Sequence, residues 1–353
     1  MGEGEAIGHV GSLDRTERDL ALVRADGAYS SGQFPIYTAR MNELKIGLLC
    51  WNQNTDWPAL RDAGLRAERL GYDSLWAWDH LYPIVGDPHG PFYEGWLTIT
   101  AWAAATQRIR IGLMVGANPY RNPALVAKMA ATLDNISGGR AYLGIGAAWN
   151  ENEARDFGFE FGDGPPERLR WLAEALPIMR GMLAGEAPTA AGNRYHAQHV
   201  RNEPRPIQPH LPILIGGGGE KVTLRLVAKF ADANNLGNGF ETVKAKEQIL
   251  LRHCEEVGRD PNEIERTTGV GVVVIRDSRA EAERVFQSLF AHNRVAHPWQ
   301  NQPIGTPEDV AEKLAPYLGI GYRHMIAGHP APYDEESATR LATEVRPALE
   351  RLG

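Results

Sequence analysis

Cysteine, positive charge and long apolar runs are all scarce in this chain. Its 353 residues include only two cysteines, Cys50 and Cys254, which indicates free thiols in a reducing compartment and not a disulfide framework. No apolar run reaches the roughly 18 residues that a membrane-spanning helix needs. Residues 1–40 contain no apolar segment typical of a secretory signal. We therefore expect a cytoplasmic protein without a membrane partner.

Several motif classes are missing as well. The net charge of −7 comes without a basic stripe that would neutralise phosphates, which argues against a nucleic-acid partner. No GxGxxG follows the first predicted strand, so the usual dinucleotide fingerprint is absent. His80 beside Asp79, and His196 near His199, are potential metal ligands. Because no HxH, HExxH or CxxC spacing converges on strand ends, we expect no required metal.

What the chain does have is a regular alternation of strand and helix patterns beyond Met41. Short apolar runs predict eight buried strands, over residues 45–50, 74–78, 109–115, 140–148, 212–216, 233–236, 268–275 and 324–327. Helical patterns follow them, over 57–70, 93–105, 123–137, 166–183, 220–230, 242–257, 307–318 and 335–352. Eight such cycles are the count of a (β/α)8 barrel.

We therefore predict a single α/β domain, a (β/α)8 TIM barrel, over residues 41–353. An open doubly wound sheet also alternates strands and helices, but it seldom needs so many parallel units. Two insertions are expected, over 185–206 and 278–303, the second with a helix at 279–291. Such insertions shape a pocket or a subunit contact, or they decorate the surface. Residues 1–40 are predicted to form a poorly ordered N-terminal extension.

Polar and small residues gather where the predicted strands end, which in a closed barrel is where ligands bind. They are Asp79, His80, Tyr82 and Pro83 after strand two, Asn118 and Tyr120 after strand three, Trp149, Asn150, Asn152 and Glu153 after strand four, Gly216 to Gly219 after strand five, and Asn234, Asn235 and Asn238 after strand six. His80 is a candidate general acid or base, because imidazole exchanges a proton near neutral pH. Asp79 either tunes that charge or holds backbone, and a purely structural role is the more common one for an isolated Asp-His pair.

Two of these strand ends are rich in small residues. Gly144 and Gly146, followed by two alanines, leave room for a flat ligand against the backbone, or they serve packing alone. The segment 216–219 is four glycines that lead directly into a helix, where backbone amides and close approach suit a phosphate. The same four glycines are also compatible with a tight turn and nothing more.

Four segments together resemble the bacterial luciferase-like superfamily and, within it, the branch that depends on coenzyme F420, a deazaflavin with a phosphorylated, glutamylated tail. They are GYDSLWAWDHLYP from Gly71, IRIGLMVGANPYRNPALVAKMAATLDNISGGR from Ile109, LGIGAAWNENEARDFG from Leu143 and ILIGGGGEKVTLRLVAKFAD from Ile213. The resemblance covers nearly all of residues 41–353. It implies a barrel in which the cofactor ring lies across the strand ends.

The resemblance also implies roles for individual residues. A non-prolyl cis peptide is expected between Met114 and Val115, behind the cofactor ring. Asn118 and Asp79 are expected at the polar edge of the ring, and Gly216, Gly217 and Gly218 at the phosphate. The other expected cofactor-binding residues are Trp149 and Asn152.

His80 matches the histidine that moves the substrate proton in the sugar-phosphate dehydrogenase of this family. The tryptophan that follows that histidine is Ile84 here, and its acidic partner at the fourth strand end is replaced by Trp149. We therefore expect no sugar-phosphate oxidation, and the sequence assigns His80 no acidic partner. Tyr82 and Tyr120 are the next candidates for a proton donor.

Three functions follow as hypotheses. The first is an F420-dependent oxidoreductase that transfers a hydride between the deazaflavin and a small organic substrate. The second is an FMN-dependent monooxygenase that uses oxygen and a partner reductase, and the third is a flavin-binding barrel without catalysis. Homodimers are common in the superfamily, so we expect one here, through the second and third helices with residues such as Leu125 and Met129; these residues are also compatible with packing on the barrel.

Overall fold

The computed structural model describes residues 43–297 and 299–352, so the predicted extension over residues 1–40 lies outside the described residues. One parallel sheet has the order β3-β2-β1-β13-β10-β9-β8-β5-β4. Its strands are β1 Lys45–Cys50, β2 Ser74–Ala77, β3 Arg110–Leu113, β4 Gly116–Ala117, β5 Leu143–Gly146, β8 Ile213–Gly216, β9 Ala233–Leu236, β10 Glu265–Val272 and β13 His324–His329.

The sheet closes into a barrel. Only Met114 and Val115 separate β3 from β4, so these two segments are consecutive parts of one barrel strand. At the other end of the strand order β4 pairs with β5, and an isolated parallel bridge joins Ile111 to Ala141. With β3 and β4 taken as one strand, the nine segments make eight barrel strands, and the predicted (β/α)8 barrel is confirmed.

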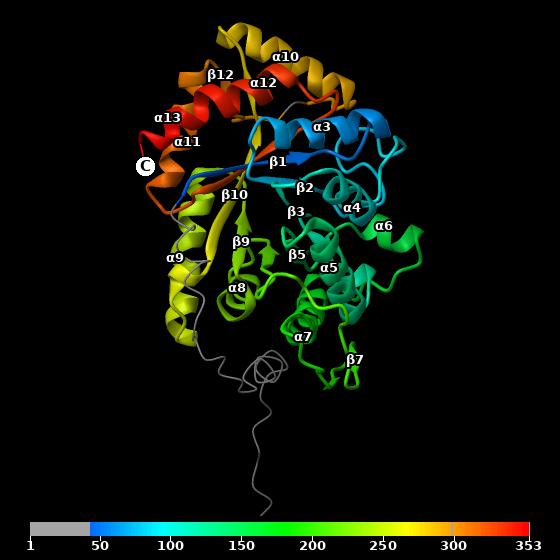
Figure 1. Ribbon diagram of the computed structural model, residues 1–353. Helices are drawn as coiled ribbons and strands as arrows, with labels where there is room; N and C mark the ends of the chain where they lie inside the picture. The colour runs from blue at the N-terminus through cyan, green and yellow to red at the C-terminus, as the bar shows by residue number, and fades with distance from the viewer. Residues whose placement is uncertain (1–42, 298, 353) are drawn as a thin grey trace, which may run out of the picture. The chain divides into compact units, whose positions relative to one another are not determined.

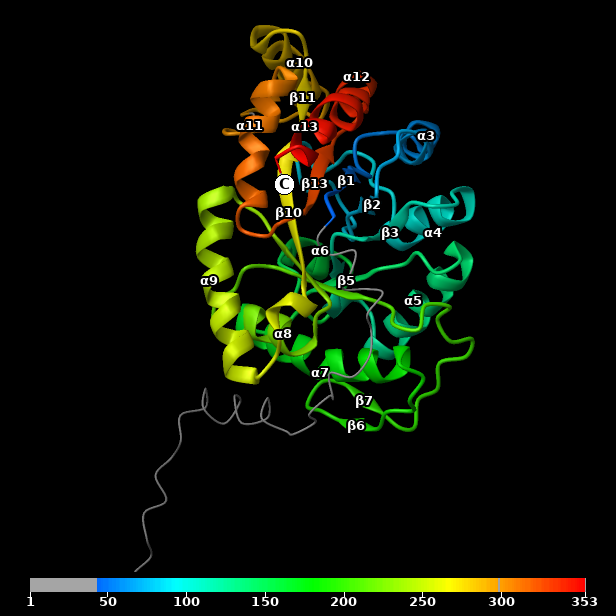
Figure 2. The same cartoon turned by 60° about the vertical axis from the view of Figure 1, so that its left-hand side comes forward.

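Helices cover the outside of this barrel in both ribbon views (Figure 1, Figure 2). They are α3 Trp57–Arg69, α4 Gly95–Ala105, α5 Pro123–Ser137, α7 Pro165–Leu183, α8 Thr223–Phe230, α9 Phe240–Val257, α11 Pro307–Leu318, α12 Glu335–Arg340 and α13 Arg346–Glu350, with a π-helical turn η3 Leu341–Val345 between the last two. Local sequence explains their ends. In α5 the side chain of Asn122 accepts a hydrogen bond from the Ala124 amide, and Gly138 ends the helix with a φ of 68°.

The structure contains several elements of only two or six residues that the sequence patterns did not predict. They are the helix α6 Glu151–Asp156, the hairpin β6 Ala190–Ala191 with β7 His196–Ala197 in the first insertion, and the strand β12 Ile304–Gly305. This last strand pairs with β11 Val274–Ile275, at the end of the predicted strand 268–275. The predicted helix of the second insertion is α10 Arg279–His292. Elements this short bury too few residues to show a period in the sequence.

The barrel interior is filled by side chains. Trp76, Tyr142 and Leu214 are buried in its centre. Towards the amino-terminal ends of the strands the Glu265 carboxylate accepts hydrogen bonds from Tyr142 and forms a buried pair with His324 Nδ1 at 3.0 Å. Burial opposes the charge of Glu265, but His324 and a lysine hold its pKa well below the usual range. Because side chains fill the amino-terminal end of the barrel, the carboxyl-terminal rim is the side open to a ligand.

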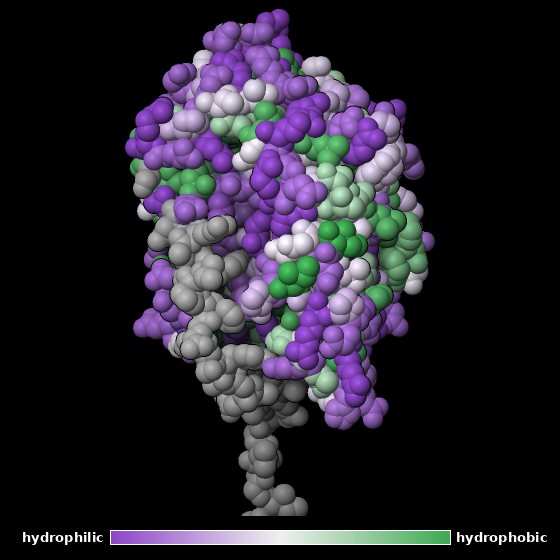
Figure 3. Space-filling model, viewed as in Figure 1, coloured by the Kyte–Doolittle hydropathy of each residue, from purple (hydrophilic) through white to green (hydrophobic). Residues whose placement is uncertain are grey.

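The surface carries apolar residues as separate patches among polar ones (Figure 3). Leu97 on α4 is 73% exposed and Leu125 on α5 is 52% exposed, whereas Met129 is half-buried. The expected dimer contact through these two helices stays a prediction. Across the described ranges, none of the helices combines the length and apolar character that a membrane crossing requires.

Candidate active site

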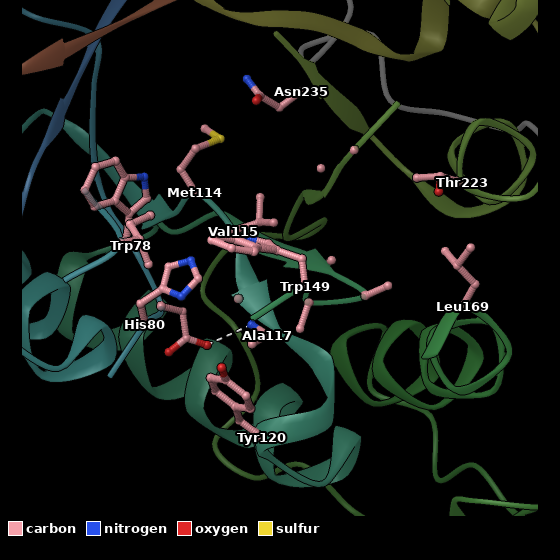
Figure 4. Close-up of a pocket in the computed structure, with 18 residues that line it drawn as sticks. Trp78, His80, Met114, Val115, Ala117, Tyr120, Trp149, Leu169, Thr223 and Asn235 are labelled. Carbon is pink, nitrogen blue, oxygen red and sulfur yellow. Dashed lines mark hydrogen bonds between the residues drawn. The ribbon is translucent and has the colours of Figure 1, made fainter. Parts of the chain in front are cut away.

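A cavity of about 380 Å³ opens at the carboxyl-terminal ends of the barrel strands (Figure 4). Its lining comes from the ends of strands β2, β4, β5, β8 and β9 and from the adjoining loops and helices. The lining residues are Trp78, Asp79, His80, Ile84, Met114, Val115, Gly116, Ala117, Tyr120, Gly146, Ala147, Ala148, Trp149, Leu169, Gly216, Gly217, Thr223 and Asn235. The strand ends that the sequence singled out therefore meet in one place.

The floor of the cavity is flat because two glycines accommodate Val115. The peptide bond between Met114 and Val115 is cis, as predicted. A Cβ added at Gly146 would lie 2.9 Å from a Val115 methyl group, and one at Gly216 would lie 2.8 Å from it. Neither position has room for a side chain. The glycines serve packing, and that packing places Val115 and the backbone of the two glycines in the cavity lining.

His80 lies at one side of this floor and is held by a carboxylate. Its Nδ1 is 2.8 Å from Glu153 Oε2, and the Glu153 side chain is fully buried. No residue of the described chain hydrogen-bonds the other ring nitrogen, Nε2. An ionised carboxylate only accepts hydrogen bonds, so Nδ1 donates and the Nε2 lone pair is left available in the cavity.

Glu153 accepts four hydrogen bonds. Oε1 receives the Leu81 amide at 2.9 Å and the Tyr82 amide at 3.1 Å, while Oε2 receives His80 and the Tyr120 hydroxyl, the latter at 2.7 Å. Burial opposes ionisation, but the hydrogen bonds from His80, from Tyr120 and from the Leu81 amide lower the pKa of Glu153 below its usual value. Burial and the adjacent Glu153 raise the pKa of Tyr120. Glu153 therefore stays ionised and Tyr120 stays protonated at neutral pH.

A sharp turn and a short helix place Glu153 next to His80. Ala148 has a φ of 62°, which turns the chain sharply after β5, and α6 then begins at Glu151. Glu153 and Ala154 are the buried residues of this short helix. Next to α6, the ring of Phe157 packs on Tyr82 with centroids 5.5 Å apart. The turn and the aromatic contacts point the Glu153 carboxylate under the loop that follows β2.

Asp79 is a structural residue of the rim as well as part of the lining. It is 2% exposed, and its Oδ2 accepts the Ala117 amide at 2.8 Å. Its two oxygens also bind Arg121 at 2.7 and 3.0 Å, and Arg121 in turn contacts Glu94 at 2.7 Å. Both oxygens are thus occupied by the protein, in agreement with the alternative in which Asp79 holds backbone.

The structure does not bring Asn118 and Asn152 into the cavity. Asn118 is fully buried behind the lining, where its Nδ2 lies 3.2 Å from the Tyr195 hydroxyl and its Oδ1 has no hydrogen-bond partner. Asn152 lies exposed on α6, next to the inward-facing Glu153. Neighbours in a helix point in different directions, so a polar cluster in the sequence supplies only some of its members to a site.

The glycine segment after β8 connects this cavity to a second one. Gly217 has a φ of 116°, and its amide donates to the Asn235 carbonyl at 3.2 Å, so that amide is already used. Gly217 and Asn235 line both cavities, and Gly218 lines the second, of about 560 Å³, together with Lys246 on α9. The next helix begins at Thr223 and not at Glu220 as expected.

Comparison with known proteins identifies the family of this chain. The family model of the luciferase-like monooxygenases matches residues 20–303. The chain belongs to the luciferase-like monooxygenase family. It is an oxidoreductase of that family, and the resemblance inferred from the sequence motifs is confirmed.

Individual relatives are similar over almost the whole chain. An F420-dependent glucose-6-phosphate dehydrogenase from Amycolatopsis mediterranei is 27% identical over 346 residues, 88% of this chain and 100% of that protein. An F420-dependent secondary alcohol dehydrogenase, solved with an F420–acetone adduct, has a TM-score of 0.74 at 22% identity and covers 87% of this chain and 99% of its own. The F420-dependent tetrahydromethanopterin reductase from Methanopyrus kandleri has a TM-score of 0.73 at 19% identity, with 87% and 99% covered.

Within this luciferase-like site, the partner of His80 is the residue that sequence reasoning missed. Glu153 was among the polar residues after the fourth strand, but 73 positions separate it from His80. No spacing rule links two residues across that distance. A charged residue next to the small-residue strand end was the available signal, and only the fold shows that it turns inward while Asn152 turns out.

Proposed function

We propose that this protein transfers a hydride between coenzyme F420 and a small organic substrate, with His80 as the group that moves the substrate proton. The observation that carries the proposal is the buried contact between Glu153 and His80 beside a flat, glycine-lined floor. A carboxylate that fixes the tautomer of a histidine is a common way to prepare a general acid or base. The F420-dependent relatives support the choice of cofactor.

The cavity fits a planar tricyclic ring. Val115, Gly146 and Gly216 form an apolar floor without protruding side chains. Bound there, the deazaflavin supplies a ring carbon that accepts or gives a hydride. The chain's own contribution is to hold that ring on the floor, to exclude water from its face and to place His80 Nε2 beside it. In the oxidative direction Nε2 accepts the hydroxyl proton, and in the reductive direction it returns it.

The second cavity favours F420 over FMN. It extends from Gly217 past Gly218 to Lys246, beyond the place where a phosphate at the glycines would lie. FMN ends at its phosphate, whereas F420 continues into an anionic glutamylated tail. Lys246 Nζ contacts Glu220 at 2.6 Å and is partly exposed, so it is in place to exchange that contact for a tail carboxylate. We therefore infer that Gly218 and Lys246 hold the end of the cofactor away from His80.

Parallel titrations test the cofactor. The full-length protein is titrated with F420 and with FMN while intrinsic tryptophan fluorescence is followed, and we expect F420 to bind at least about tenfold more tightly. Lys246→Ala should weaken F420 binding and leave FMN binding unchanged. Lys244→Ala, an exposed lysine of the same helix, is the matched control. Equal or tighter binding of FMN would contradict the choice of F420, and oxygen consumption with reduced FMN would support the monooxygenase.

A further inference from the structure

We propose that the substrate is an uncharged, largely apolar alcohol or carbonyl compound with an aromatic or alicyclic body. Trp78, Ile84 and Trp149 form the wall that recognises it, next to His80. The inference rests on the proposed function and names the substrate class of that same site. It separates this protein from its sugar-phosphate dehydrogenase relatives, whose named substrate carries two negative charges.

The first observation is the charge of the lining. Among the described residues, no lysine or arginine lines the cavity that contains His80. The cation behind the rim, Arg121, is fully engaged with Asp79 and Glu94. A substrate phosphate or carboxylate at the His80 end of this cavity would lose its water without gaining a cationic partner, which is strongly unfavourable. An uncharged substrate has no such penalty.

The second observation is the aromatic wall. The Trp149 ring meets the His80 ring edge-on, with centroids 5.4 Å apart. Trp78 packs on the buried Trp51 at 5.0 Å, and Trp51 is supported at 5.5 Å by Trp299 from the second insertion. This insertion therefore braces the wall from behind. Aromatic faces of this kind bind apolar bodies, and rings in particular.

The third observation is that Ile84 is held in place independently of its side chain. The Ile84 amide donates to Gln53 Oε1 at 2.9 Å, and Gln53 Nε2 donates to the Val85 carbonyl at 2.7 Å. Gln53 is fully buried. The backbone of this loop is thus fixed by a side chain that does not line the cavity. A change of the Ile84 side chain alters the wall and leaves its support intact.

The two ends of the cavity have different chemistry, as Figure 4 shows. Trp78, His80, Met114 and Trp149 gather at one end, while Leu169 and Thr223 lie at the other. Gly217 packs near Thr223 at the second end, so the cofactor's reactive ring and the substrate meet at the first. In oxidation the carbinol C–H bond breaks and its hydride passes to the deazaflavin, the O–H proton passes to His80 Nε2, and a C=O bond forms. Reduction of the carbonyl reverses each transfer.

A pair of probes that differ by one charge tests the substrate class. Acetophenone and para-acetylbenzoate have the same reacting carbonyl, and their binding to the F420-loaded protein is measured by calorimetry. We expect the neutral ketone to bind at least about 100-fold more tightly, because the carboxylate has no cation to meet. Turnover with the corresponding alcohols, followed by deazaflavin absorbance, should show the same order, with glucose 6-phosphate inactive.

An engineered cation provides the reciprocal test. Ile84→Lys should reduce the preference for the neutral ketone by about tenfold or more, because the new ammonium pairs with the carboxylate. Leu97→Lys, on the exposed face of α4 and outside the cavity, is the matched control and should change nothing. F420 binding is measured separately by tryptophan quenching, and the two ketones are compared in proteins saturated with F420.

The outcomes separate the two proposals. If F420 fails to bind, the proposed function is wrong. If the carboxylated probe binds as well as acetophenone or better, with or without F420, the substrate class is wrong whatever the cofactor. Turnover of glucose 6-phosphate that exceeds turnover of the neutral alcohol would overturn it as well.

Discussion

Glu153→Gln is the substitution that tests the site most directly. The carboxylate accepts four hydrogen bonds, two of them at Oε2 from His80 and Tyr120. In the variant the amide oxygen can keep the two backbone contacts, which leaves the amide nitrogen facing His80 Nδ1. That nitrogen donates, so Nδ1 must accept and the imidazole proton moves to Nε2. The histidine keeps its position and loses its free lone pair in the cavity.

The expected size of the effect follows from this geometry. Loss of the correctly protonated base should lower kcat for alcohol oxidation by about 100-fold or more. Loss of charge-assisted hydrogen bonds should lower the free energy of unfolding by about 1–3 kcal/mol. The cofactor floor does not involve Glu153, so the Kd for F420 should be unchanged. A large loss of kcat without a loss of cofactor binding distinguishes misdirection of His80 from general damage.

The assay compares two variants of one helix. Steady-state turnover is followed by deazaflavin absorbance, and unfolding by denaturant titration, for Glu153→Gln and for Glu151→Gln. Glu151→Gln is the same chemical change at a side chain that is 72% exposed and lies away from His80. We expect the control to behave as the wild type. A kcat within twofold of wild type for Glu153→Gln would refute the role of this carboxylate in orienting His80.

His80→Ala should retain F420 binding and slow turnover by about 100-fold or more, and an unchanged rate would remove His80 from the mechanism. Tyr120→Phe should lower the free energy of unfolding by about 1 kcal/mol and alter turnover far less than Glu153→Gln, as denaturant titration and kinetics will show. Burial lowers the pKa of His329 from 6.5 to about 4, so this histidine stabilises the fold above its unfolded pKa and loses that contribution as the pH falls from about 6.5 to 4. His329→Gln should flatten the fall in unfolding free energy over that range, and a profile identical to wild type would exclude the assignment.

The ionised state of Glu153 gives the site its own pH limit. Its folded pKa lies below the usual value of about 4.5, so the carboxylate contributes stability above that value and loses it as the pH falls through the folded pKa. The anchored tautomer of His80 should therefore persist throughout the neutral range. A change of turnover within the neutral range would therefore not come from loss of this anchor.

Most strands and helices of the barrel could be predicted from the local sequence. A buried parallel strand is a short apolar run between turn residues, and each run along the chain matched a barrel strand within a few residues. The helix ends at Asn122 and Gly138 could also be predicted, because helix capping depends on residues that are neighbours in the chain. Closure then follows from the number of units, and with it the convergence of Asp79, His80 and the glycines at one rim.

The tertiary structure alone decided which polar residues work together. The contact between His80 and Glu153 depends on the turn at Ala148 and on a six-residue helix that has no sequence period. The same turn sends Asn152 outward, and burial behind the lining removes Asn118 from the cavity. Sequence patterns record how each residue relates to its near neighbours, so they determined the strands, the helices and the rim. Contacts between side chains from distant strands depend on how loops turn and pack, and that information exists only once the barrel has closed.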